Sequence, residues 1–454
     1  MIESSLAAAA HIMNGTLVGS DRRFVGISTD TRTLVEDELF IALQGPNFDA
    51  CDFVTTAAEI NAAAAVLPKV SEVDIPQITV DDTRLALGRL AASWRRKMSA
   101  KVIGITGSNG KTTLKEMIAN CLSLSAETLA TRGNLNNEIG LPLMLLSLSE
   151  EHRYAVIEMG ANHPGEIAYL TSLAEPDVVV ITNAAPAHLE GFGDLDGVAR
   201  AKGEILQGPV GPLFVVLNVD DPYFAYWNSL LSDDTVISFG VEGDASVFAT
   251  DIQAEGDETN FSLHIHSEEI PIRLPLAGLH NVRNACAAAA VLHGLGADSK
   301  QIRQGLESVH AVSGRLQPVE SIKSLTVYDD SYNANPQSVI AAAEFLAAQP
   351  GSNWLVLGDM GELGEDEVLL HKAVGRAARR LGIDRILATG KLSQNTVKTF
   401  GSGGEWYENI DGVIEELQRS ATQDTNVLIK GSRFMQMERI VEALINEPPT
   451  RRKD

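Results

Sequence analysis

Hydrophobic residues recur along this chain with two periods, one typical of strands and one typical of helices. The clearest example begins at Lys101, where a short β-type apolar run leads into a turn that contains Gly107 and Gly110. A helical pattern follows at once, with apolar residues at i, i+3, i+4, i+7 and i+8: Leu114, Met117, Ile118, Cys121 and Leu122. The pattern predicts a strand, a glycine-rich turn and a helix in immediate succession.

Strand and helix patterns continue to alternate through the rest of the chain. In the middle of the chain, strand patterns lie at residues 153–160, 177–183 and 213–217, and an alanine-rich helix ends at Gly294. Residues 246–272 alternate with period two, which predicts an antiparallel addition to the sheet. A second unit has strand patterns at residues 325–328, 354–357, 385–388 and 427–429, and its last helix lies at 437–445. Such alternation predicts parallel sheets with crossover helices.

The first hundred residues form a separate α/β pattern. A strand is predicted at residues 39–43 and an alanine-rich helix at 57–66. A second helix is predicted at 84–98, with Asp82 among its candidate caps. We therefore expect an α/β protein with three domains, at residues 1–98, 99–313 and 314–454.

Composition narrows the class of protein. The chain has 454 residues, of which 44% are hydrophobic and 21% charged, as in ordinary globular proteins. A formal net charge of −24 argues against a nucleic-acid-binding surface. Three widely spaced cysteines fit a reducing compartment. No signal peptide and no apolar run of about 18 residues is found, so a cytoplasmic location without a membrane span is expected.

The turn after the first strand of the middle unit has the composition of a phosphate-binding loop. It comprises Gly107, Ser108, Asn109, Gly110, Lys111, Thr112 and Thr113. Backbone N–H groups of such a loop meet a polyphosphate, while the lysine reaches the β- and γ-phosphates and the first threonine holds Mg²⁺. The common pattern has a further glycine where this chain has Ile105. A tight turn without a ligand is the alternative interpretation.

The local sequence supports a metal-binding role for one of three further side chains and an ordinary structural or exposed role for the other two. Glu158 ends a strand after the loop, where a carboxylate can hold Mg²⁺. His188 follows another strand, but a lone histidine is more often structural, and Mg²⁺ prefers oxygen ligands. Lys202 lies in a helix-like run, and a lysine there is usually exposed.

Asparagine-rich and glycine-rich clusters provide candidate substrate contacts. Asn134, Asn136 and Asn137 suit an amide- or carboxylate-bearing ligand, with an ordinary Gly/Asn turn as an equal alternative. Clusters at residues 329–338, 358–364 and 430–433 each follow a strand of the last unit. They should share one rim, because the carboxyl ends of parallel strands face ligands. Asn333 and Asn335 are the candidate contacts there.

Several segments together resemble the Mur ligases of peptidoglycan synthesis. They are ITGSNGKTT, TRGNLNNEIGLP, EMGANHPGEI, TNAAPAHLEGFG, AKGEI, LHNVRN and DDSYNANPQS. The resemblance covers essentially the whole chain, and in this family the residue that replaces the first glycine is normal. It implies a uridine-nucleotide-binding domain at 1–98, a central ATP-binding domain of P-loop ATPase type at 99–313, and a Rossmann-like domain at 314–454.

The resemblance also implies roles for individual residues. It implies ATP and two Mg²⁺ ions, a metal site that contains Thr112, Glu158, His188 and Lys202, and a carbamylated Lys202. Lys111 would act on the phosphates, so Lys111, Lys202, His188 and Glu158 are the candidate catalytic residues. The implied nucleotide contacts outside the loop are Asn281, Arg315 and Asp330. The region around Ser28, Arg32 and the loop before Phe48 matches the part that binds the uridine nucleotide.

The implied reaction is the ATP-dependent ligation of D-alanyl-D-alanine to UDP-N-acetylmuramoyl-tripeptide through an acyl phosphate. A monomer acting on these small molecules, with no nucleic-acid partner, is expected. Three alternatives remain open: the ligase step that adds the third peptide residue, a folylpolyglutamate synthetase-like ligase, and a switch ATPase without ligase activity. Asn335-Pro336 is followed by Gln337, which differs from the D-N-P-R signature of enzymes that add diaminopimelate.

Overall fold

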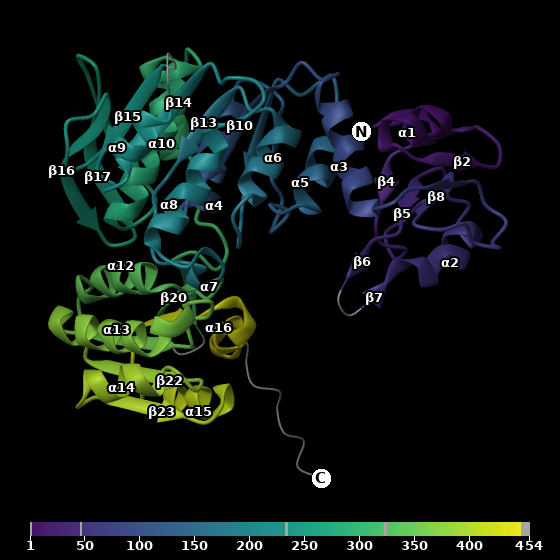
Figure 1. The fold of residues 1–454 in the computed structure, drawn as a ribbon. Coiled ribbons are helices and arrows are strands. Elements are labelled where there is room, and N and C mark those ends of the chain that lie inside the picture. The colour runs from purple at the N-terminus through teal and green to yellow at the C-terminus, as the bar shows by residue number, and fades with distance from the viewer. Residues whose placement is uncertain (1, 46–47, 232–234, 322–324, 446–454) are drawn as a thin grey trace, which may run out of the picture.

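Three large sheets organise the chain into three lobes (Figure 1). The structure is a computed structural model that describes residues 2–45, 48–231, 235–321 and 325–445. Residues 46 and 47 of the predicted loop before Phe48 lie outside the described residues, as do residues 446–454 of the last predicted domain. No helix of the described ranges is long and apolar enough to cross a membrane.

The strands of each sheet follow a defined spatial order. The five-stranded N-terminal sheet has the order β2 (Thr16–Val18), β9 (Gln77–Thr79), β8 (Ala64–Leu67), β5 (Leu39–Ile41), β4 (Ile27–Ser28). The nine-stranded central sheet has the order β11 (Thr128–Ala130), β12 (Tyr154–Glu158), β10 (Lys101–Thr106), β13 (Val178–Ile181), β14 (Phe214–Asn218), β15 (Val236–Gly240), β16 (Val247–Glu255), β17 (Glu258–Ile265), β18 (Glu268–Leu274). The six-stranded C-terminal sheet has the order β19 (Gln317–Glu320), β20 (Thr326–Asp330), β24 (Thr425–Lys430), β21 (Ser352–Leu357), β22 (Arg385–Thr389), β23 (Gly404–Tyr407). Two small sheets pair β1 (Glu3–Ser5) with β3 (Arg23–Val25) and β6 (Gln44–Gly45) with β7 (Phe48–Asp49).

The predicted helix at residues 57–66 is wrong over its second half. Helix α2 covers Val54–Glu59, and Ala64–Leu67 form β8 instead. Alanine favours helices, but β8 lies between β5 and β9, pairs in parallel with both, and is fully buried. Burial and strand pairing therefore override the intrinsic preference of the alanines.

Helix α3 (Thr83–Arg95) connects the N-terminal sheet to the central sheet. Asp82 caps it by accepting a 2.9 Å hydrogen bond from Leu85 N, which confirms the predicted helix start. The helix packs against α5 (Gly140–Leu146) and α6 (Glu166–Ala174) of the central unit. At its end, Arg95 donates to the backbone oxygen of Ala174 and to the carboxylate of Asp177.

The central sheet is parallel from β11 to β16 and antiparallel from β16 to β18, as predicted. Helices cover both faces, which explains why its parallel strands are almost continuously apolar. One face carries α4 (Lys111–Ser123), α10 (Leu279–Gly294) and α11 (Ser299–Glu307). The other carries α5, α6, α8 (Leu195–Gly203) and α9 (Phe224–Ser229). Two further helices are α1 (Leu6–Met13) and α7 (Leu189–Phe192).

The C-terminal sheet carries the rim that the sequence predicts. Helices α12 (Pro336–Ala347), α13 (Glu367–Leu381) and α14 (Gln394–Phe400) cover one face, and α15 (Ile410–Ser420) and α16 (Glu438–Ile445) cover the other. Lys430 Nζ at the end of β24 bonds Asp330 Oδ2 at the end of β20 at 2.7 Å. Gly358 N after β21 donates to the oxygen of Lys430 at 2.9 Å. The three polar clusters therefore meet, and the prediction is confirmed.

Candidate active site

The turn between β10 and α4 holds two glycines in backbone conformations that other residues rarely adopt. Gly107 has a φ of +144°, and Gly110, the residue before α4, has a φ of +82°. A Cβ atom on Gly107 would lie 1.9 Å from Thr182 Oγ1, and one on Gly110 would lie 2.6 Å from Asn284 Oδ1. Both positions therefore require glycine, and the backbone can approach a ligand closely there.

The position that lacks the usual glycine belongs to the strand. Ile105 is buried within β10 and pairs with Glu158 of β12 in the parallel register. The turn therefore begins only after Thr106, and a larger side chain at residue 105 packs in the core. The same register sets the carboxylate of Glu158 beside the first turn of α4.

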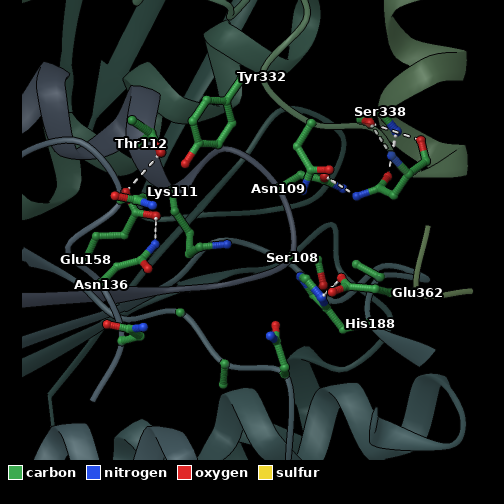
Figure 2. Close-up of a pocket in the computed structure, with 18 of the residues that line it drawn as sticks. Ser108, Asn109, Lys111, Thr112, Asn136, Glu158, His188, Tyr332, Ser338 and Glu362 are labelled. Atoms are coloured by element: carbon green, nitrogen blue, oxygen red, sulfur yellow. Dashed lines mark hydrogen bonds and ion pairs between the residues drawn. The ribbon is translucent and has the colours of Figure 1, made fainter. Parts of the chain in front are cut away.

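Polar side chains of this turn are tied to the end of β12 (Figure 2). Thr112 Oγ1 donates a 2.9 Å hydrogen bond to Glu158 Oε2, and Asn136 Nδ2 donates to Glu158 Oε1 at the same distance. Lys111 Nζ bonds the oxygen of Gly107 at 2.7 Å. Burial lowers the pKa of Lys111, and the carboxylate of Glu158 opposes that shift.

A polar cavity of about 420 Å³ lies between the central and C-terminal sheets. Most of the predicted site residues line it, namely Ser108, Asn109, Gly110, Lys111, Thr112, Asn134, Asn136, Asn137, Glu158, His188, Arg315, Asn333 and Asn335. Sequence reasoning placed the clusters that contain Tyr332, Ser338, Glu362 and Lys430 on the rim without singling out these residues, and it did not select the polar lining residues Glu138, Asn162, His163 and Glu166. Several of these occur in the motifs quoted above, but only the fold shows which of them face the cavity.

The C-terminal unit reaches the phosphate-type loop directly. Asn335 Nδ2 donates to Asn109 Oδ1 at 2.7 Å, and Arg315 Nη2 contacts Thr112 Oγ1 at 3.3 Å. The Arg315 guanidinium also stacks over the ring of Tyr332, 4.2 Å from its centroid. These contacts bring a planar cation to the loop from outside the central sheet.

His188 faces the C-terminal unit. Its Nδ1 atom contacts the Glu362 carboxylate, and this contact lowers the pKa of Glu362. Both residues have left-handed backbone conformations, with φ values of 55° and 60°. The backbone nitrogen of Glu190 also donates to the oxygen of Glu362 at 3.3 Å.

Lys202 lies in α8 and is not among the residues that line the cavity, but it is buried, contrary to the usual behaviour of lysine. Its side chain is buried, and its Nζ atom lies 5.2 Å from the centroid of the Phe192 ring. Burial, and then repulsion from Lys111, lower the pKa of Lys202 from 10.5 to about 7. A substantial share of this amine is therefore uncharged and nucleophilic near neutral pH.

Besides Lys202, four predicted residues of the central and C-terminal units are not among the residues that line the large cavity. Gly107 is the first residue of the loop. Thr113 lines a second cavity of about 240 Å³ beside α4. Asn281 is buried in the first turn of α10, where it donates to the oxygen of Ala277 at 2.8 Å. Asp330 accepts from Lys430 beneath the rim.

The two N-terminal candidates lie on another sheet. Ser28 is buried and its hydroxyl donates to the oxygen of Asp30 at 2.9 Å. Arg32 is exposed and pairs with the Asp30 carboxylate at 2.6 Å, which lowers the pKa of that carboxyl to about 2. The structure does not bring this pair to the large cavity.

The donor set at the loop fits one Mg²⁺ ion that is shared with a nucleotide. Glu158 and Thr112 provide hard oxygen ligands, and Mg²⁺ in enzymes is usually held by one or two carboxylates together with substrate phosphates and water. Across the described part of the chain, no group of three or more His, Cys, Asp and Glu side chains could hold a metal ion. A site built from protein groups alone therefore does not fit, whereas a shared site does.

Sheet order, loop and cavity define an α/β nucleotide-binding protein of the phosphate-loop class. Family models for the Mur ligase middle domain and for the Mur ligase, glutamate ligase domain match residues 105–292 and 314–433. The chain belongs to the Mur ligase family. The family resemblance and the three-domain α/β architecture are therefore confirmed.

Individual relatives match over almost the whole chain. The UDP-N-acetylmuramoyl-tripeptide–D-alanyl-D-alanine ligase of Escherichia coli (strain K12) is 43% identical over 447 residues, covering 98% of this chain and 99% of that protein. The crystal structure of MurF from Acinetobacter baumannii has a TM-score of 0.92 at 37% identity and covers 98% of this chain and 99% of that one. MurF from Thermotoga maritima in complex with ADP has a TM-score of 0.83 at 26% identity, with coverages of 92% and 96%.

Proposed function

We propose that this chain uses ATP to join D-alanyl-D-alanine to UDP-N-acetylmuramoyl-tripeptide, which completes the pentapeptide precursor of peptidoglycan. One observation carries the proposal: Thr112 of the loop bonds Glu158 at the end of β12 and contacts Arg315 of the C-terminal unit, and all three residues line one polar cavity. The choice of substrates is supported by a relative of this specificity that is 43% identical over 98% of the chain.

The chemistry begins with a carboxylate that cannot acylate an amine directly, because oxide would have to leave. Transfer of the γ-phosphoryl group to the terminal carboxylate of the tripeptide gives an acyl phosphate and ADP. The free amine of the dipeptide then attacks the carbonyl carbon, the amine loses a proton, and phosphate leaves with the C–O electron pair. Lys111 and Arg315 stabilise the negative charge that both steps place on phosphoryl and carbonyl oxygens.

Glu158 and Thr112 would hold a Mg²⁺ ion together with the phosphates, and such an ion supplies charge neutralisation during phosphoryl transfer. Asn136 orients Glu158 through a hydrogen bond within the central unit. Asn335 of the C-terminal unit orients Asn109 of the loop in the same way. The C-terminal unit reduces access of water to the loop, which protects the acyl phosphate from hydrolysis.

Lys202 and His188 are proposed to serve a second metal ion after modification of the lysine. The uncharged amine of Lys202 attacks CO₂, a new N–C bond forms, and loss of one proton leaves a carbamate anion. Its lowered pKa of about 7 supplies the required neutral amine. The carbamate would replace a buried cation with oxygen ligands of the kind that Mg²⁺ prefers.

The remaining ligand contacts and the domain roles are proposals of the same kind. The N-terminal unit, residues 1–98, is proposed to bind the uridine nucleotide near Ser28 and Arg32. The second cavity lies beside Thr113 and is lined partly by apolar side chains, so it could receive the base of ATP. Asn281 in the first turn of α10 and Asp330 at the end of β20 are proposed nucleotide contacts. We propose that the protein acts as a monomer and that it acts in the cytoplasm, where ATP is available.

The ligation reaction itself tests this proposal. Purified protein is given ATP, Mg²⁺, UDP-N-acetylmuramoyl-tripeptides ending in lysine or diaminopimelate, and either D-alanyl-D-alanine or a single amino acid. The expected result is phosphate release and a UDP-pentapeptide only with the dipeptide. A product with a single amino acid would instead identify the ligase that adds the third residue or a folylpolyglutamate-type ligase. Phosphate release without any ligated product would support a switch ATPase.

A further inference from the structure

The contact between His188 and Glu362 joins the central and C-terminal units at the cavity. Both residues lie in loops, outside the helices and strands. His188 precedes the short helix α7, and Glu362 follows β21 in the loop that leads to α13. Both residues line the cavity from opposite units. Figure 2 shows the two side chains pointing toward each other across the domain boundary.

The backbone on both sides of this contact is held in an unusual conformation. His188 and Glu362 have φ values of 55° and 60°, a region that residues other than glycine rarely adopt. The backbone hydrogen bond from Glu190 N to Glu362 O lies beside the contact between the two side chains. Two strained residues and two adjacent polar contacts therefore coincide at one point of the domain interface.

The two nitrogens of His188 have different surroundings. Nδ1 is buried from solvent, and among the described residues the Glu362 carboxylate is the acceptor within reach. No hydrogen bond to Nε2 is found in the described part of the chain, and the ring lines the cavity. A carboxylate beside one ring nitrogen keeps the proton there, which leaves the other nitrogen with a free lone pair.

We propose that Glu362 is a positioning residue that fixes His188 in the Nδ1–H tautomer, with Nε2 free toward the cavity, only while the C-terminal unit is docked on the central unit. The proposal rests on the proposed function, in which His188 serves a metal ion. It adds that the orienting carboxylate comes from the other unit. Docking of the C-terminal unit on the central unit would then itself fix the tautomer of His188.

Two properties of the chain make this arrangement testable. Glu362→Gln keeps the length and an acceptor oxygen, whereas Glu362→Ala removes the acceptor. Glu365, three residues further on, is an exposed acid without a described side-chain contact, so Glu365→Gln is a matched control for the loss of one negative charge.

The tautomer can be read without substrate or metal. Full-length protein labelled with ¹⁵N-histidine is examined by long-range ¹H–¹⁵N correlation at pH 8, and the His188 signal is assigned by its absence in His188→Gln. We expect the Nδ1–H pattern in the wild type, in Glu365→Gln and, in part, in Glu362→Gln, and its loss in Glu362→Ala. An Nε2–H pattern in the wild type, or no change in Glu362→Ala, would overturn the proposal.

A second measurement determines how much Mg²⁺ the variants need for ligation. The Mg²⁺ concentration that half-saturates ATP-dependent ligation should rise about 10–100-fold in Glu362→Ala, with a smaller rise in Glu362→Gln and none in Glu365→Gln. A purely structural role would lower the midpoint of thermal unfolding without changing the Mg²⁺ requirement, and that result would also overturn the proposal. If the wild type ligates nothing but shows the Nδ1–H pattern, the proposed function fails while the role of Glu362 stands.

Discussion

Thr112 Oγ1 and Glu158 Oε2 are joined by a 2.9 Å hydrogen bond although the two residues lie 46 positions apart. The parallel pairing of β10 with β12 creates this contact, because it sets residue 158 opposite residue 105 at the end of the strand that leads into the loop. Arg315 reaches the same hydroxyl from the C-terminal unit. One hydroxyl therefore marks the point where two units and a candidate metal ligand meet.

Removing the amine of Lys111 should abolish turnover with little effect on folding. Lys111 Nζ now bonds the oxygen of Gly107 and lines the cavity, so it is available to phosphate oxygens. We expect Lys111→Ala to lower kcat about 10²–10³-fold, the usual cost of losing one preorganised donor. Lys101→Ala, at an exposed position at the start of β10, is the control and should keep wild-type kcat. Near-normal ATP turnover in Lys111→Ala would contradict the proposed role of the loop.

The buried amine of Lys202 should make stability depend on pH. Its pKa is about 7 in the folded chain and 10.5 as the ordinary value, so between these values the unfolded state binds more protons. Raising the pH from about 7 to about 10 should therefore stabilise the wild type relative to Lys202→Met, while below pH 7 the difference should stay constant. Urea unfolding of both proteins in CO₂-free buffer measures this. A difference that does not change with pH would refute the lowered pKa.

Activity should also depend on CO₂ if Lys202 is carbamylated. Lys202→Ala should lose turnover, and bicarbonate should raise the activity of CO₂-depleted wild-type protein, more strongly above pH 7 because more of the amine is neutral there. A short carboxylate such as acetate should restore part of the activity to Lys202→Ala. Unchanged turnover in that variant would remove the carbamate from the mechanism.

Asn335 has two separable roles, which one substitution can distinguish. Its oxygen accepts from Ser338 N and caps α12, while its Nδ2 donates to Asn109 across the domain boundary. Asn335→Asp keeps the cap but presents an oxygen to Asn109 Oδ1, so thermal stability should be nearly unchanged while the KM for ATP rises several-fold. Asn335→Ala should additionally lose about 1 kcal/mol of stability. Equal KM values for wild type and Asn335→Asp would show that the bond between the units is dispensable.

Arg315 should not be replaceable by lysine. The guanidinium plane stacks on Tyr332 at 4.2 Å while one nitrogen contacts Thr112, and an ammonium group cannot do both. We expect Arg315→Lys to lower kcat/KM for ATP at least about tenfold. Arg303→Lys, at an exposed position of helix α11, serves as the control. Wild-type kinetics in Arg315→Lys would mean that charge alone is needed.

Much of the fold follows from the apolar pattern of the sequence. The strand, turn and helix at residues 101–123, the antiparallel addition and the shared rim of the last sheet were all predicted, because parallel strands buried on both faces are continuously apolar and polar residues gather at their ends. The error at residues 57–66 has a physical cause: an alanine run carries no periodic signal that separates a buried strand from a helix.

The candidate site was less accessible from local sequence alone. Lys202 looks like an exposed helix residue, and only its burial and its proximity to Lys111 lower its pKa. Glu362 lies in the cluster at residues 358–364 that the sequence places on the rim, but nothing in the local sequence shows that it meets a histidine of the central unit. The family resemblance pointed to Lys202 and His188, whereas the pairing of His188 with Glu362 required the three-dimensional structure.

The central claim is that ATP activates the tripeptide carboxylate as an acyl phosphate, and the fate of the carboxylate oxygens tests it most directly. UDP-N-acetylmuramoyl-tripeptide with both terminal carboxylate oxygens replaced by ¹⁸O is incubated with the protein, ATP, Mg²⁺ and D-alanyl-D-alanine, and the released phosphate is examined by ³¹P NMR. One ¹⁸O atom per phosphate, formed in step with the pentapeptide, is the result we predict. Phosphate without ¹⁸O, or phosphate released without ligated product, would contradict it.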